Sequence, residues 1–101
     1  MKKILFIFLI TFFSTTAFAD DQMDLGLEIF KNKAMCGSCH TLKAADSEGE
    51  IGPSLDMIKP QVEQIIYAVT NGIGVMPAWE GVLTTKEIEA VAFYIFNSTN
   101  K

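Results

Sequence analysis

The sequence contains no arginine, and its 101 residues include a single histidine and only two cysteines. Nucleic acids and anionic membranes call for clustered lysine and arginine, so the lack of arginine argues against both as partners. One histidine and two cysteines leave only carboxylates to complete a zinc site, which needs about four ligands. No segment has the alternating pattern of a half-buried strand. The absences therefore favour a helical chain that does not bind nucleic acid.

The one long apolar run lies at the N-terminus. Met1-Lys2-Lys3 is a basic start, Ile4 to Phe13 is almost entirely apolar, and Ala17-Phe18-Ala19 has small residues at the two positions that a signal peptidase reads. The alternative is an uncleaved membrane anchor, but residues 4–19 give only 16 positions, against about 20 for a spanning helix. We predict a secretory signal peptide over residues 1–19, cleaved after Ala19, and no membrane insertion of the mature protein.

The mature chain, residues 20–101, is short and acidic. It keeps six lysines against twelve acidic residues, a net charge of −6. Such a surface meets partners through their basic patches. A single domain of 82 residues has a marginal core unless a staple or a cofactor adds to it. We therefore expect one domain over residues 20–101, stabilised in addition by a covalent cross-link or a cofactor.

Three segments have helical patterns. The first follows the acidic pair Asp20-Asp21 and should end near Asn32. The second begins at Lys59-Pro60, since proline suits a first helical position, and stops at Asn71-Gly72. The segment from Lys43 to Glu50 between them is acidic and is expected to be a solvent-exposed loop.

The third helix is the most clearly marked. Thr84-Thr85-Lys86-Glu87 is a capping box. Apolar residues then fill the helical template at every expected position: Ile88, Val91, Ala92, Ile95 and Phe96. The preceding segment, Gly72 to Gly81, contains three glycines, one proline, a methionine and a tryptophan, which is typical of an irregular loop with large apolar side chains.

The motif that carries chemistry is Cys36-Gly37-Ser38-Cys39-His40, the C-x-x-C-H signature of haem c attachment. Two thiols at this spacing can reach the two vinyl groups on one edge of the macrocycle, and the next residue then offers its imidazole to the iron. A thioredoxin-like dithiol would accompany alternating strands and helices, which the pattern lacks. A plain disulfide in an exported protein would leave His40 unexplained. The motif predicts one covalent haem c, bound through Cys36 and Cys39 with His40 as proximal ligand.

At this point the chain resembles the class I c-type cytochromes over nearly all of residues 20–101. In that family the motif follows an N-terminal helix, and a distal methionine lies in a loop ahead of a C-terminal helix, which is the order here. Gly26 and Phe30 resemble the family's packing pair on the first helix, which crosses the last helix where Val91 and Tyr94 stand. The resemblance implies an all-α fold of about three to five helices around one covalently bound haem.

The distal ligand has to be a methionine, because the chain has no second histidine. Met76 has the best context: Gly72 and Gly74 permit tight turns, Pro77 forces Met76 into an extended conformation, and the segment resembles the family's Met-Pro loop. Met35 abuts the attachment site and cannot cross to the other face of the haem. The candidates are Met23, Met35, Met57 and Met76, of which we favour Met76 as iron ligand.

Two further residues are predicted to bind the cofactor indirectly. Gly52-Pro53-Ser54-Leu55 resembles the family segment in which the proline carbonyl accepts the second imidazole N–H of the proximal histidine. A metal-bound histidine needs such an outer acceptor, and Pro53 offers one on a stiffened backbone. Trp79 is expected either to donate its indole N–H to a haem propionate or to cover the ring edge.

These residues predict a periplasmic electron-transfer protein with His/Met ligation and no enzymatic activity. With both axial positions filled there is no open site on the iron, and methionine ligation favours ferrous iron. Redox proteins would serve as electron donor and acceptor. Two alternatives stay open: a haem c subunit of a periplasmic dehydrogenase complex, and a five-coordinate haem sensor or peroxidase-like enzyme, which requires Met76 to be absent from the iron.

Overall fold

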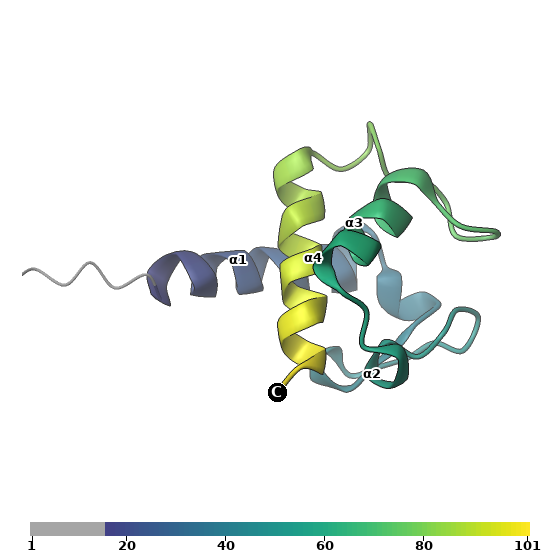
Figure 1. Ribbon diagram of the computed structural model, residues 1–101, viewed down its shortest axis with the longest axis horizontal. Helices are drawn as coiled ribbons and strands as arrows, with labels where there is room; N and C mark the ends of the chain where they lie inside the picture. Colours follow the sequence, from purple (N-terminus) through teal and green to yellow (C-terminus); the bar gives the residue numbers. More distant parts are fainter. Residues whose placement is uncertain (1–15) are drawn as a thin grey trace, which may run out of the picture.

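The computed structural model describes residues 16–101, and its arrangement is shown in Figure 1. The elements are the α-helices α1 (Thr16–Glu28), α2 (Leu55–Ile58), α3 (Val62–Asn71) and α4 (Thr85–Thr99), the helical turns η1 (Ile29–Lys33), η2 (Cys36–Ser38) and η3 (Lys43–Ala45), and the strands β1 (Thr41–Leu42) and β2 (Ser47–Glu48). The predicted leader lies mostly outside the described residues and stays a prediction. Within residues 16–101, no helix has the length and apolar character needed to cross a bilayer.

The crossing of α1 over α4 organises the core, and α1 runs across α4 in Figure 1. A Cβ at Gly26 would collide with the Ala90 carbonyl and the Tyr94 side chain, so glycine is required where the two backbones approach. The rings of Phe30 and Tyr94 pack with their centroids 6.1 Å apart and their planes tilted by 54°. Val91 is fully buried at the same crossing. The packing roles predicted for these residues are confirmed.

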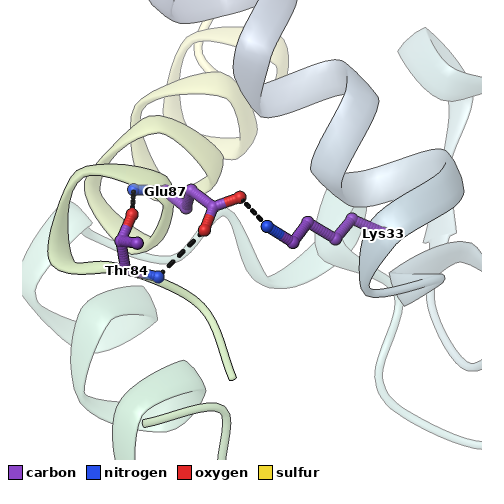
Figure 2. A network of polar contacts seen from close by, with 3 residues as sticks. All are labelled: Lys33, Thr84 and Glu87. Atoms are coloured by element: carbon purple, nitrogen blue, oxygen red, sulfur yellow. Dashed lines mark hydrogen bonds and ion pairs between the residues drawn. The ribbon is translucent and has the colours of Figure 1, made fainter. Parts of the chain in front are cut away.

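The start of α4 is fixed by the predicted capping box, which Figure 2 shows in detail. The Thr84 hydroxyl accepts from the Glu87 amide (3.1 Å), and the Glu87 carboxylate accepts from the Thr84 amide (3.0 Å). The same carboxylate forms an ion pair with Lys33, the last residue of η1. Glu87 therefore ties the beginning of α4 to the segment that leads into the Cys motif.

The helix boundaries differ from the prediction at three places, the first being that α1 begins at Thr16, ahead of the acidic pair Asp20-Asp21. The first helix does not simply end near Asn32: from Ile29 to Lys33 it widens into a π-helical turn, η1. The second helix begins later than expected, at Val62, because Gln61 and Gln64 form a capping box and Lys59 is in the left-handed conformation (φ 43°). The four-residue helix α2, which Lys59 ends, had no sequence signal.

The segment from Lys43 to Glu50 is largely exposed to solvent, as predicted, but it is more regular than a loop. Strands β1 and β2 pair antiparallel, with Thr41 opposite Glu48 and Leu42 opposite Ser47. Leu42 and Ala45 belong to the core cluster that also joins α1, α3 and α4. Two-residue strands are too short to produce an alternating pattern, so the sequence could not reveal them. Apart from this small sheet, the described chain is helical, as predicted.

Candidate functional site

The Cys motif lies on a tight backbone turn just after η1. Met35 adopts the left-handed conformation (φ 51°), and η2 then runs from Cys36 to Ser38. The amides of Cys39 and His40 both donate to the Cys36 carbonyl, at 3.1 and 3.0 Å. The turn thus brings both cysteines and the histidine onto one short, hydrogen-bonded segment.

The side chains of the two cysteines are half-buried. Burial raises the pKa of the Cys36 thiol to about 11; a hydrogen bond from its own backbone opposes this rise, and the nearby Cys39 adds to it. A reactive dithiol instead needs a lowered thiol pKa. The burial of Cys36 therefore disfavours the thioredoxin-like alternative.

The His40 ring is held by a hydrogen bond to the Pro53 carbonyl, 2.7 Å from Nδ1. A carbonyl can only accept, so Nδ1 donates its proton to Pro53, and Nε2 is the ring nitrogen that is left to bind the iron. This is the tautomer and orientation that an iron-ligating histidine needs. The structure brings together the predicted pair His40 and Pro53 in the arrangement expected of them.

Two glycines that the sequence analysis did not select support the same turn. The Gly52 amide donates to the Cys39 carbonyl (2.7 Å), and a Cβ at Gly52 would lie 2.5 Å from Cε1 of His40. A Cβ at Gly49 would lie 2.6 Å from the Cys39 carbonyl carbon. The Gly49 carbonyl also accepts from the Thr41 hydroxyl (2.9 Å). Both positions require glycine because the Cys39 backbone and the His40 ring lie too close for a Cβ. In the sequence, only the position of Gly52 directly before Pro53 indicated such a role.

Met76 lies on the loop that follows α3. Gly72 and Gly74 have φ angles of 74° and 58°, which confirms the tight turns predicted there. Ile73 and Met76 exchange backbone hydrogen bonds of 3.2 and 2.9 Å, and the half-buried Met76 side chain packs against the core. Met57, by contrast, is 83% exposed. Of these two methionines, Met76 alone is placed beside the core of the domain.

Trp79 anchors the far end of the same loop. Its amide donates to the Val69 carbonyl (2.8 Å) near the end of α3, and its carbonyl accepts from the amides of Val82 and Leu83. The side chain is half-buried against the core. In Figure 1, this loop and the Cys motif segment lie on the same side of α4, away from the projecting part of α1. The two predicted halves of a haem site therefore share one side of the molecule.

Two half-buried thiols, an oriented histidine and a methionine loop on an all-α fold fit a covalent haem and define a c-type cytochrome. The family model described as "Cytochrome C oxidase, cbb3-type, subunit III" matches residues 21–95. The crystal structure of the c-type cytochrome SorU from Sinorhizobium meliloti is 49% identical, with a TM-score of 0.74 over 81% of this chain and 95% of that chain. The class I cytochrome c fold predicted from the sequence is confirmed.

Curated relatives give the same result. Cytochrome c6 of Nostoc sp. is 39% identical over 99% of this chain and 96% of its own length. Cytochrome c6 of Tetradesmus obliquus is 35% identical over 78% of this chain and 93% of its own length. The chain therefore belongs to the matched family of monohaem c-type cytochromes. It is an electron-transfer protein with a covalent haem c, for which Cys36 and Cys39 have the required spacing.

Proposed function

We propose that the mature chain, residues 20–101, is a periplasmic one-electron carrier, not an enzyme, with His40 and Met76 as the axial ligands of its haem iron. The observation that carries this proposal is the 2.7 Å hydrogen bond between Nδ1 of His40 and the Pro53 carbonyl. It fixes the ring with Nε2 free to bind the iron, and it raises the basicity of that nitrogen.

The distal side of the proposal rests on the loop from Gly72 to Trp79. The loop's backbone hydrogen bonds present Met76 against the core, while Met57 points into solvent. Trp79 follows on the same loop, where its indole is proposed to lie at the haem edge or to meet a propionate. A thioether ligand favours the ferrous state and leaves no coordination position for a substrate.

The haem supplies reversible Fe(III)/Fe(II) chemistry: one electron arrives from a donor and one leaves to an acceptor, with no bond made or broken in the protein. The polypeptide holds the ligands in place in both states. His40 would be held in both oxidation states by its hydrogen bond to the Pro53 carbonyl and by the close approach of Gly52. Export to the periplasm is supported by the leader pattern in residues 1–19.

Intact mass and optical spectroscopy of the exported native protein test this proposal. We expect the mass of residues 20–101 plus one haem, and a reduced protein that does not bind carbon monoxide because Met76 occupies the sixth position. Carbon monoxide binding by the untreated reduced protein would instead favour the sensor or peroxidase-like alternative. A mass without haem, or with a Cys36–Cys39 disulfide, would contradict the proposal altogether.

The second candidate is a haem c subunit of a periplasmic dehydrogenase complex, and the surface that would join it to such a complex is present. The tip of the methionine loop is strongly apolar and exposed, with Val75 at 87% and Ile73 at 60% exposure. Such side chains suit a transient docking patch or a permanent interface. Size-exclusion chromatography of the native material separates the two, since a carrier elutes at the size of the free domain and a subunit elutes with its complex.

A further inference from the structure

A groove separate from the proposed haem site lies between α3 and the start of α4. Its volume is about 420 Å³. Three aliphatic side chains form its apolar part: Ile66 from α3, Leu83 from the connecting loop, and Ile88 from α4. Around them are carboxylates and hydroxyls, contributed by Thr70, Glu80, Thr84, Thr85 and Glu89. The groove thus combines a small apolar floor with a polar, acidic rim.

The two charged residues that line the groove are both acidic, and the nearest lysine in the sequence is Lys86, three positions before Glu89 on α4. No lysine lines the groove, and Glu80 and Glu89 are both exposed. Among residues 16–101, the ion pair found is Lys33–Glu87, so neither rim carboxylate has a cationic partner there. The positive end of the α4 dipole is near, but the Thr84 hydroxyl already accepts from the Glu87 amide. The groove therefore suits a cation and not an anion.

We propose that this groove receives a lysine or arginine side chain from the basic patch of a redox partner protein. The hydrocarbon stem would lie on Ile66 and Leu83, and the cationic head would sit between Glu80 and Glu89. Charge complementarity selects this occupant: the mature chain carries a net charge of −6, and this hollow concentrates two of the unpaired charges around an apolar floor. The inference rests on the proposed electron-carrier function, which requires such a partner.

The position of the groove gives the contact a functional consequence. Glu80 directly follows Trp79, and the Trp79 amide is tied to the Val69 carbonyl (2.8 Å). The rim carboxylate is therefore held at the base of the loop that carries Met76. A basic side chain bound here would bring its protein against the base of this loop, on the distal side of the proposed haem site.

The test uses the ferrous holoprotein, which is diamagnetic with both axial ligands bound, and tetra-arginine amide as probe. Titration followed by amide chemical shifts should move the Thr70, Gly81 and Thr85 signals. The double variant Glu80→Gln, Glu89→Gln should weaken binding about fivefold at low salt, as expected for two exposed charge contacts. The matched control, Glu48→Gln with Glu50→Gln, removes the same net charge from another segment and should weaken binding less than twofold.

Equal weakening by the two double variants would show a net-charge effect and overturn the proposal. Shifts centred away from the groove residues would overturn it as well. Binding is measured without electron transfer, so the result is separable from the proposed function. A protein that binds the peptide in the groove but binds carbon monoxide when reduced would contradict the His/Met ligation and leave the cation site standing.

Discussion

The proximal segment and the distal loop of the candidate site are held by different kinds of hydrogen bonds. The proximal segment, residues 36–53, is joined by hydrogen bonds between positions 8 to 13 residues apart, such as Thr41 to Gly49 and His40 to Pro53. The distal loop, residues 72–83, is fastened at its base through Trp79, and its tip makes only the local bonds between Ile73 and Met76. Contacts between distant positions therefore fix the proximal segment, whereas the hydrogen bonds at the distal tip are local.

The largest expected effect comes from removing the attachment. Cys36→Ala with Cys39→Ala should give a largely unfolded or rapidly degraded chain, because 82 residues bury too little apolar surface without the haem. Any residual protection in hydrogen exchange should lie in the proximal segment and the α1–α4 crossing, not in residues 72–83. Ser38→Ala, an exposed position in the same motif, is the control and should retain haem and fold.

A cooperative thermal transition in the double cysteine variant, comparable with that of the wild type, would contradict this expectation. Protection spread evenly over both halves would remove the proposed difference between them.

The second largest effect is expected from removing the proposed distal ligand. Met76→Ala should lower the midpoint potential by on the order of 0.1 V, a small part of the roughly 0.8 V range that axial ligands span. It should also open the iron to carbon monoxide while both thioethers stay intact. Met57→Ala removes an exposed side chain and should change neither property. Redox titration and reduced-state spectra measure both; an open site in the Met57 variant would mean that the loop is wrongly assigned.

The proximal side is tested by Gly52→Ala. The added methyl group would lie 2.5 Å from Cε1 of His40, so the ring or the 49–53 segment has to move. Overpacking of this kind costs about 1–3 kcal/mol, and we expect lower stability together with a changed NMR spectrum of the His40 ring protons in the ferric, paramagnetic protein. Ser54→Ala, on the same segment but with no capping hydrogen bond from its side chain, should leave both unchanged. Identical spectra for all three proteins would show that Gly52 does not position His40.

The smallest effect concerns Glu87. Its ion pair with Lys33 and its hydrogen bond from the Thr84 amide lower the pKa of this carboxyl below its ordinary value of 4.5. A lowered folded-state pKa stabilises the protein at pH values above 4.5, and this contribution disappears as the pH falls through the folded-state value. Glu87→Gln should therefore be slightly less stable than wild type at pH 7, with the difference vanishing in acid. Thermal melts across pH measure it, and Glu48→Gln is the exposed control.

Features set by neighbouring residues were predictable from the sequence, and features set by distant contacts were not. The capping box at Thr84 and Glu87 spans three residues, and the turns at Gly72 and Gly74 depend on their own backbone freedom. The Lys33–Glu87 pair joins residues 54 positions apart. Gly52 matters because it meets the ring of His40, twelve positions earlier. The Cys motif was enough to predict the chemistry of the site. The residues that hold the motif in place could be found only from contacts in the folded chain.

The π-helical turn η1 (Ile29–Lys33) changes the direction in which successive side chains of the first helix point. An α-helix advances about 100° per residue, and a single π turn accommodates one extra residue within an otherwise continuous helix. Up to Glu28 the helix keeps the phase that directs Gly26 toward α4. Beyond it, the wider turn shifts that phase by one residue, about 100°, before the helix ends at Lys33.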